Sequence, residues 1–325
     1  LYTGEIETWR SSETGLSPVE TYAAVVLPEL DGATTPVPLF GLERSEAAGL
    51  DVTDAAPIAG RPERLARRVL AWARIRRTPP EARRVALVAY DYPPARGNAG
   101  NASYLDVSAS LSAILARLEA EGYDVGGGSE DPLGELLDAG LDNEARGGPW
   151  QGEHLASERY LEAFERLPAR RRDEVVARFG PPPGEILRDE QGLRVPGRWH
   201  GNVFVGLQPA RIPGAGAEAS HDQGLPPHHQ YIAFYEHLRR EGVHVVVHVG
   251  THGTVEFTPG KELGLSDSCF PDLLQGDLPS LYVYTLGNPS ESTLARRRWH
   301  ATLVTHHLPD FVPSGLYGEA QELLD

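Results

Sequence analysis

Four short runs of mainly apolar residues constrain the fold of this 325-residue chain more than any other feature of its sequence. They cover residues 85–90, 203–207, 243–249 and 281–285, and each has the length of a single strand. Strands that are buried on both faces read as nearly unbroken apolar runs, because neither row of side chains meets water. Strands of this kind that alternate with helical segments predict an α/β fold, with mostly parallel sheets and helices on both faces.

Helical patterns and turn residues fill the stretches between these runs. In residues 61–76, Leu65, Val69, Trp72 and Ile75 recur at helical spacing, and two prolines follow at 79–80. We further expect helices over 104–121, 157–179, 228–241 and 291–304, short strands over 23–27 and 37–40, and loops over 91–100, 214–224 and 250–261.

The same pattern divides the chain into three parts. Residues 1–125 are expected to form one α/β lobe and residues 195–325 a second, with a cleft between the two lobes. Residues 126–194 begin with a glycine-rich, acidic stretch and continue into a charged helical pattern. This middle part is interpreted as a variable insertion or linker that carries a helical segment.

Composition excludes several classes of protein. Lys+Arg 30 against Asp+Glu 46 gives a net charge of −16, which argues against a nucleic-acid or anionic-membrane surface. The longest apolar runs have about six residues, far below the length of a membrane span. The chain lacks methionine, so we expect an internal piece of a longer protein. Its one cysteine, Cys269, excludes an internal disulfide and fits a reducing cytoplasmic location.

Histidines concentrate in one region. Ten of the twelve lie between His221 and His307, and imidazole suits both proton transfer and metal binding. Within this region His248 ends an apolar run, and His252 and Glu256 follow at intervals of four residues. Glycines and β-branched residues argue against a helix there, so we interpret the segment as a strand that leads into a glycine-rich loop. Loops at the carboxyl ends of parallel strands are where such sheets bind ligands.

Two stretches of the sequence resemble nucleotide-binding motifs but do not match them. A phosphate-binding loop that ends at Lys261 would need glycine at position 255 and serine or threonine at 262, but the chain has Val255 and Glu262. The stretch GNAGNAS at 97–103 does not match the dinucleotide fingerprint and is interpreted as a tight turn between a strand and a helix. The chain therefore shows no ATP site of these types.

Several ordered segments carry a family resemblance. They are YPPARGNAGNASYLDV (92–107), GNVFVGLQP (201–209), LPPHHQYIAFYEHL (225–238), HVGTHGTVEFTPGKELGLSDSCFPDLLQGDLPSLYVY (248–284) and NPSESTLARRR (288–298). These segments resemble the large subunits of cobaltochelatase (CobN) and of magnesium chelatase (its H subunit). The resemblance implies a large catalytic subunit that binds a tetrapyrrole and inserts a divalent metal, either cobalt or magnesium. It also implies an AAA+ ATPase partner and its companion subunit, which would hydrolyse ATP in place of this chain.

The chemistry of insertion assigns roles to residues of the matching segments. Two N–H protons leave the macrocycle as the ion enters, so Glu256 is expected to accept protons or deliver the metal. His248 and His252 would join it in catalysis and in a metal-binding set. The expected substrate-binding residues are Asn98, Asn101, Tyr104, His228, His229, Lys261, Arg296 and Arg297, with Arg298 beside them.

The metal and the reaction class leave alternatives. Imidazole ligands favour cobalt, hence a corrinoid precursor in cobalamin biosynthesis, over magnesium, which prefers oxygen ligands. Magnesium insertion into protoporphyrin IX, in chlorophyll biosynthesis, is the alternative within the family. A non-catalytic tetrapyrrole-binding protein, and a zinc hydrolase built on His248, His252 and Glu256, are alternatives of other classes.

Overall fold

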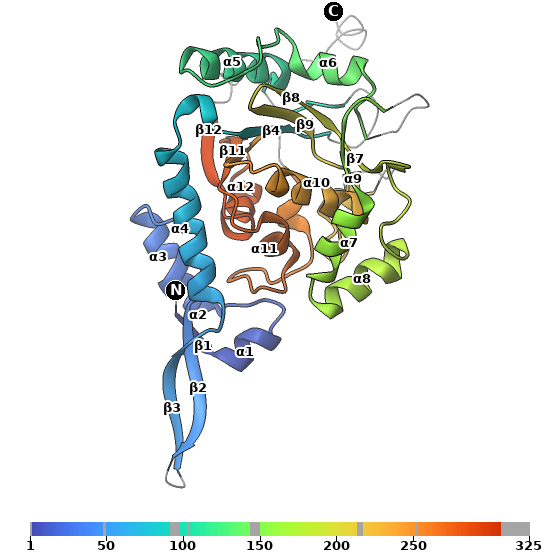
Figure 1. Cartoon of the computed structure of the whole chain (residues 1–325). Coiled ribbons are helices and arrows are strands. Elements are labelled where there is room, and N and C mark those ends of the chain that lie inside the picture. Colours follow the sequence, from blue (N-terminus) through green and yellow to red (C-terminus); the bar gives the residue numbers. More distant parts are fainter. Residues whose placement is uncertain are drawn as a thin grey trace, which may run out of the picture.

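The computed structural model describes residues 2–47, 50–91, 98–102, 105–143, 150–212, 217–250 and 253–306 (Figure 1). Its helices are α1 (Ile6–Ser11), α2 (Pro18–Thr21), α3 (Leu27–Leu30), α4 (Arg61–Arg77), α5 (Val107–Ala120), α6 (Pro132–Asp138), α7 (Ser157–Glu165), α8 (Ala169–Phe179), α9 (Ala217–His221), α10 (His229–Arg240), α11 (Phe270–Gln275) and α12 (Pro289–Arg298). Its strands are β1 (Tyr2–Glu5), β2 (Phe40–Ala47), β3 (Leu50–Pro57), β4 (Val85–Ala89), β5 (Glu153–Leu155), β6 (Arg188–Asp189), β7 (Gly192–Val195), β8 (Gly197–His200), β9 (Val203–Leu207), β10 (Val245–Val249), β11 (Ser280–Thr285) and β12 (Thr302–His306).

A mostly parallel sheet forms the centre of the molecule. Within the described ranges it has six strands in the order β12-β11-β10-β4-β9-β8, and only β8 runs antiparallel to its neighbour. The apolar runs of the sequence form its inner strands, in which β4 and β9 are buried at every position. The mostly parallel α/β prediction is therefore confirmed.

Helices cover both faces of this sheet. Val85, Leu87 and Ala89 pack on one face with apolar residues of α5 and α6, whereas Ala86 and Val88 face a second core that includes α7, α10 and α11. Alternate residues of one strand thus enter two different cores, as the two-residue period of a strand requires. Figure 1 shows α5 and α6 on one side of the sheet and α10, α11 and α12 on the other.

Two smaller sheets lie outside this centre. Strands β5, β7 and β6 form one, and β1, β2 and β3 form the other, in which the β2–β3 hairpin projects away from the rest of the structure (Figure 1). The predicted pair of lobes around a cleft is not confirmed. Strand β4 comes from the first predicted lobe, yet it pairs with β9 and β10 of the third part in one continuous sheet.

The strand predicted over residues 23–27 is wrong, because this stretch is helical. Helix α2, the π-helical turn Tyr22–Val26 and α3 follow one another directly. The start signal is a capping box, in which the Ser17 hydroxyl accepts from the Glu20 N–H (3.3 Å) and the Glu20 carboxylate accepts from the Ser17 N–H (2.8 Å). This local signal overrides the strand propensity of the valines that follow.

Other boundaries also differ from the predictions. The strand expected over 37–40 begins only at Phe40, as part of the hairpin. The helix expected over 291–304 ends at Arg298, because buried Trp299 and the left-handed His300 (φ 47°) turn the chain into β12. The pattern over 157–179 is two helices, since Pro168 begins a new one.

The remaining segments follow the sequence closely. Helix α4 confirms the helix predicted over 61–76, and α10 confirms the one over 228–241. Helix α5 begins three residues later than predicted, at Val107, after Asp106, whose carboxylate accepts from the Ala109 N–H (2.9 Å). The predicted linker contains α6, and the loops predicted over 214–224 and 250–261 contain α9 and the 3-10 turn Val255–Phe257. None of the helices in the described ranges is both long and apolar enough to cross a membrane.

Candidate active site

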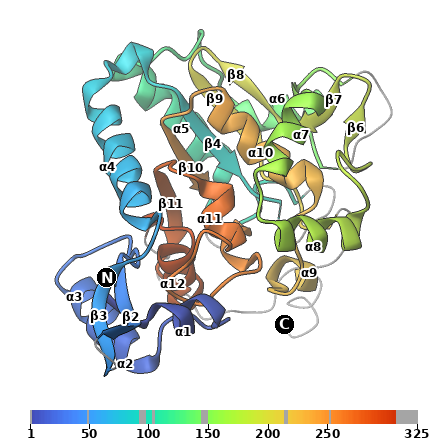
Figure 2. The same ribbon diagram turned by 60° about the horizontal axis from the view of Figure 1, so that its bottom comes forward.

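The candidate site lies at the carboxyl ends of the central parallel strands. Tyr90 follows β4, Gln208 follows β9 and Gly250 follows β10. β4 and β10 are neighbours in the sheet. The next strand after β4 in this sheet, β9, lies towards one edge, and the next strand after β10, β11, lies towards the other edge, so the strand order reverses between β4 and β10. Open α/β sheets commonly bind their ligands beyond the strand ends at such a reversal. Figure 2 shows β4, β10 and β11 in the sheet with α11 and α12 beside them.

Glu256 is a buried carboxyl group with one oxygen held and one left over. It lies in the 3-10 turn and is 1% exposed. The Tyr282 hydroxyl donates to its Oε1 (2.7 Å), while Oε2 has no hydrogen-bond partner among the described residues. Burial raises the pKa of Glu256 to about 7, against the Tyr282 hydrogen bond and the Arg298 charge, which lower it. A carboxyl group with this pKa can both take up and release a proton at neutral pH.

His248 lies next to Tyr282, the residue that holds Glu256 Oε1. It pairs with Tyr282 across β10 and β11, so both side chains share one face, and their rings are 5.2 Å apart. Burial lowers the pKa of His248 to about 3, so the ring is neutral. Its Nε2 is 3.2 Å from the Tyr235 hydroxyl, and its Nδ1 has no partner in the described part of the chain.

The hydrogen bond of His248 Nε2 is compatible with both neutral tautomers of its ring. The Gln208 side-chain amide donates to the Tyr235 hydroxyl, whose oxygen has a second lone pair to accept from an Nε2–H and whose proton can instead be donated to a bare Nε2. With the proton on Nε2, Nδ1 is a free lone pair of the kind that binds metals; with the proton on Nδ1, it is an N–H donor.

Two side chains hold the loop before Glu256, Tyr282 of β11 and Gln208, which follows β9. The Gly253 N–H donates to the Tyr282 hydroxyl, and the Thr254 N–H donates to Gln208 Oε1 (2.9 Å). A Cβ at Gly253 would lie 2.9 Å from the Tyr282 oxygen, so only glycine allows this approach. These contacts fix the backbone that carries Glu256, as a preorganised site requires.

Two buried arginines lie near Glu256. Arg298 donates to the Thr258 carbonyl and to Gln223 (both 2.7 Å), and Arg211 donates to the carbonyls of Asp222 (3.1 Å) and Leu225. Both are fully buried, and neither forms an ion pair with a carboxylate of the described residues. Their Nε atoms lack hydrogen-bond partners there. Buried positive charge without a counter-charge favours an anionic ligand.

The structure engages two of the predicted substrate residues elsewhere. His228 Nε2 donates to the Ala210 carbonyl (2.8 Å), and its Nδ1 accepts from the Tyr231 N–H (3.2 Å). His229 Nδ1 is 2.7 Å from the Tyr160 hydroxyl, and its Nε2 is 2.9 Å from the Gly180 carbonyl. All four ring nitrogens are thus used inside the protein, which argues against a role in substrate contact.

The predicted cationic residues are also held by the chain itself. The Lys261 ammonium donates to the carbonyls of Arg10 (3.1 Å) and Ser12, and it lines a cavity of about 270 Å³. Arg297 pairs with Glu29 (2.8 Å), and Arg296 lies 3.8 Å from the same carboxylate. Of these three cations, Lys261 alone has no carboxylate partner within the described ranges.

Of the other predicted residues, Asn98 and Asn101 lie in the described part of the chain after β4. Asn98 is half-buried, Asn101 is exposed, and the Asn101 N–H donates to the Asn98 carbonyl (2.8 Å). Tyr104 and His252 lie outside the described residues. Within the described ranges no group of three or more His, Cys, Asp or Glu side chains is arranged to hold a metal ion. The predicted set of His248, His252 and Glu256 includes one residue beyond those ranges and stays a prediction.

Sequence reasoning missed the residues that hold Glu256 and His248 in place. Gln208 directly follows a predicted strand, and this position at a strand end was the signal in the sequence that could have identified it as a site residue. Tyr282 and Tyr235 lie inside a strand and a helix whose apolar patterns gave no reason to single them out.

Comparison with known proteins places this site in context. The family described as CobN/Magnesium Chelatase matches residues 1–325. The chain is 38% identical over 335 residues to the H subunit of the magnesium chelatase of Chlorobaculum parvum, covering 100% of this chain and 25% of that protein. It is 37% identical over 324 residues to the aerobic cobaltochelatase subunit CobN of Pseudomonas aeruginosa, covering 97% and 26%.

A solved structure agrees with these matches. The catalytic subunit of cobaltochelatase from Mycobacterium tuberculosis superimposes with a TM-score of 0.84 at 35% identity, covering 99% of this chain and 28% of that one. The chain thus spans about a quarter of the length of the curated relatives it matches.

Proposed function

The chain belongs to the CobN/magnesium chelatase family, and on that premise we propose that it carries the insertion site of a large chelatase subunit. A tetrapyrrole would bind in the crevice beyond β4 and β10, and a divalent metal would enter its ring as the second substrate. Glu256 supports this proposal most directly, because it is a fixed, buried carboxyl group with one unpartnered oxygen and a pKa of about 7.

The proposed chemistry is a proton exchange. An M²⁺ ion that enters the ring displaces N–H protons, two from a porphyrin and one from a corrin. Glu256 Oε2 would accept a proton from a ring nitrogen, while the Tyr282 hydroxyl holds Oε1 in place. Because its pKa lies near neutrality, the same group would release that proton again and, with a porphyrin, accept the second. His248 Nδ1, which has no hydrogen-bond partner in the described ranges, would be available to contact the substrates.

The charge of the site supports a carboxylate-bearing macrocycle. Arg211 and Arg298 are buried cations without a carboxylate partner in the described ranges, and Lys261 donates only to backbone carbonyls there. Tetrapyrroles of this kind carry several carboxylate side chains, which such cations would neutralise. Arg296 and Arg297 are less suited, because Glu29 already holds them.

Cobalt is the metal that we propose, with a corrinoid precursor as the macrocycle. The relatives are divided between magnesium and cobalt chelatases at nearly equal identity. Imidazole ligands, as in the predicted set of His248, His252 and Glu256, suit cobalt better than magnesium, which favours oxygen ligands. We further propose a cytoplasmic location, which the single cysteine fits. We also propose AAA+ partner subunits that hydrolyse ATP, because the sequence given has no phosphate-binding loop of its own.

A matched pair of variants tests this proposal. In the complete subunit with its ATPase partners, Glu256→Gln should keep macrocycle binding and abolish insertion, whereas Glu262→Gln, at an exposed carboxylate nearby, should leave both unchanged. Macrocycle binding is followed by absorbance, with hydrogenobyrinic acid diamide and protoporphyrin IX compared. Insertion at the normal rate by Glu256→Gln would refute the role of Glu256. A parent protein that binds a macrocycle without inserting metal would instead indicate a non-catalytic binding protein.

A further inference from the structure

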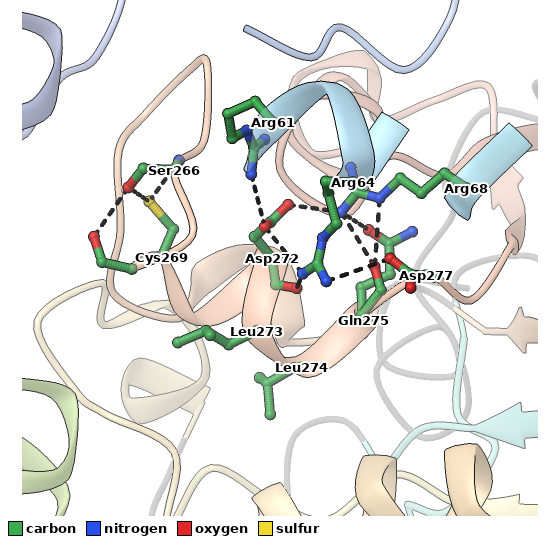
Figure 3. Close-up of polar contacts among 12 residues, drawn as sticks. Arg61, Arg64, Arg68, Ser266, Cys269, Asp272, Leu273, Leu274, Gln275 and Asp277 are labelled. Atoms are coloured by element: carbon green, nitrogen blue, oxygen red, sulfur yellow. Dashed lines mark hydrogen bonds and ion pairs between the residues drawn. The ribbon is translucent and has the colours of Figure 1, made fainter. Parts of the chain in front are cut away.

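A cluster of arginines joins α4 to the segment around α11, away from the candidate active site. Figure 3 shows Arg61, Arg64 and Arg68 extending from α4 towards Asp272 and Asp277. Arg61 lies 3.1 Å and Arg68 2.6 Å from the Asp272 carboxylate, and Arg64 contacts both carboxylates at 3.1 and 3.3 Å. Asp272 is fully buried, so three cations share one carboxylate inside the protein.

The charges of this cluster do not balance. Arg61, Arg64, Arg67 and Arg68 supply four positive charges, and Asp272 and Asp277 supply two negative charges, which leaves two positive charges in excess. Arg67 is half exposed, so water compensates much of its charge. The side chains of Arg61 and Arg68 are 2% and 6% exposed, so water cannot do the same for them. Inside a protein, such an excess favours an anionic partner.

Nitrogen atoms without hydrogen-bond partners also favour an anionic ligand at this place. Within the described ranges, Arg68 Nη1 has no hydrogen-bond partner, and neither has either ring nitrogen of His300. The His300 ring is buried, and its Nε2 lies 3.8 Å from Asp272, which is too far for a hydrogen bond. Burial, with the charge of Arg68, lowers the pKa of His300 to about 4. The neutral ring therefore offers one N–H donor beside the free nitrogen of Arg68.

Arg68 and His300 line a common cavity of about 220 Å³, which we term the α4 cavity. Thr34 continues its polar side, and Leu65, Trp72 and Leu278 form an apolar side. Asp277 also lines it, but Arg64 (3.3 Å) and Arg67 (2.9 Å) neutralise that carboxylate. The lining of the cavity is thus partly cationic and partly apolar. Its volume equals that of about seven water molecules, enough for a small organic molecule.

We propose that the α4 cavity binds a small organic monocarboxylate, with its carboxylate against Arg68 and His300 and its apolar body against Trp72 and Leu65. A carboxylate would supply the missing counter-charge and accept from the unpartnered nitrogens. The apolar wall would exclude compact, fully hydrated anions, which gain nothing from it. This site is separate from the crevice beyond β4 and β10, and the proposal does not depend on the function proposed above.

Calorimetric titration of the intact protein tests the proposal with three probes. Benzoate fits the expected chemistry, benzamide has the same shape without the charge, and inorganic phosphate has the charge without the apolar body. Benzoate should bind saturably and at least about tenfold more tightly than either of the others, because a charge-assisted hydrogen bond contributes about 1.5–3 kcal/mol. Equal binding of benzamide or of phosphate, or no saturable binding of benzoate, would overturn the proposal.

Variants locate the binding. Arg68→Gln should weaken benzoate binding at least about tenfold, while Arg76→Gln, at an exposed position of the same helix outside the cavity lining, should leave it unchanged. Trp72→Ala removes a partly exposed ring of the apolar wall and leaves the arginine cluster intact, so it tests the site if Arg68→Gln does not fold. It should weaken binding about tenfold. Equal losses in Arg76→Gln and Arg68→Gln, or no loss in Trp72→Ala, would show that benzoate binds outside the α4 cavity and would refute the assignment.

Discussion

Replacing Glu256 by glutamine should change the stability of the protein in a way that depends on pH. Burial raises the pKa of this carboxyl group from its ordinary 4.5 to about 7. Between these two values the unfolded chain has lost the proton while the folded chain keeps it. The contribution of Glu256 to the free energy of unfolding therefore falls as pH rises from 4.5 to 7. The total fall is about 3 kcal/mol, since each unit of pKa difference corresponds to about 1.4 kcal/mol.

Glutamine has no charge to bury, so it avoids this loss. Its amide places an N–H donor where Oε2 has no partner in the described ranges, at a cost of about 1–3 kcal/mol that is the same at every pH. The informative quantity is therefore the change with pH. From about pH 5 to about pH 8, Glu256→Gln should gain about 2–3 kcal/mol of unfolding free energy relative to the parent.

Urea unfolding of the parent and of Glu256→Gln across this range measures the gain. The control is Glu262→Gln, because Glu262 is exposed, and its stability difference from the parent should stay constant. A constant difference for Glu256→Gln as well would show that Glu256 titrates as an ordinary carboxyl group. The proton-acceptor mechanism would then lose its physical basis.

Two further predictions concern the supports of the two sites. Tyr282→Phe removes a hydrogen bond that lowers the pKa of Glu256. The pH–rate profile of metal insertion should therefore move to higher pH by up to about one unit, and an unchanged profile would contradict this prediction. Asp272→Asn leaves buried arginines without their counter-charge, so urea unfolding should show a loss of about 3–5 kcal/mol, whereas Arg67→Gln should change stability by less than about 1 kcal/mol.

Burial explains which parts of the fold were predictable. Residues 85–90 and 203–207 read as strands because both faces of β4 and β9 meet apolar cores, so nearly every position must be apolar. The hairpin of β2 and β3 was missed for the opposite reason. Most of its described side chains are exposed, and water imposes no apolar alternation on them.

Local signals that compete within a few residues caused the other errors. The Ser17 and Glu20 capping box was present in the sequence, but the valines beside it suggested a strand. The end of α12 depends on Trp299, which packs in the core against Tyr235 and His248. No residue in the predicted helix 291–304 announces that contact, because both partners lie more than 50 positions away in the chain.

Patterns along the chain were enough to predict that buried strands alternate with helices and that Glu256 follows one of those strands in a glycine-rich loop. The helix predicted over 61–76 also carries Arg61, Arg64 and Arg68 at spacings of three and four residues, but nothing in that spacing singled them out. Such patterns extend over only a few residues. The strand order decided the rest, because it brought Tyr282 to Glu256, Gln208 to Thr254 and α4 to Asp272. Those contacts join residues 26 to more than 200 positions apart, and only the packing of the whole chain selects them.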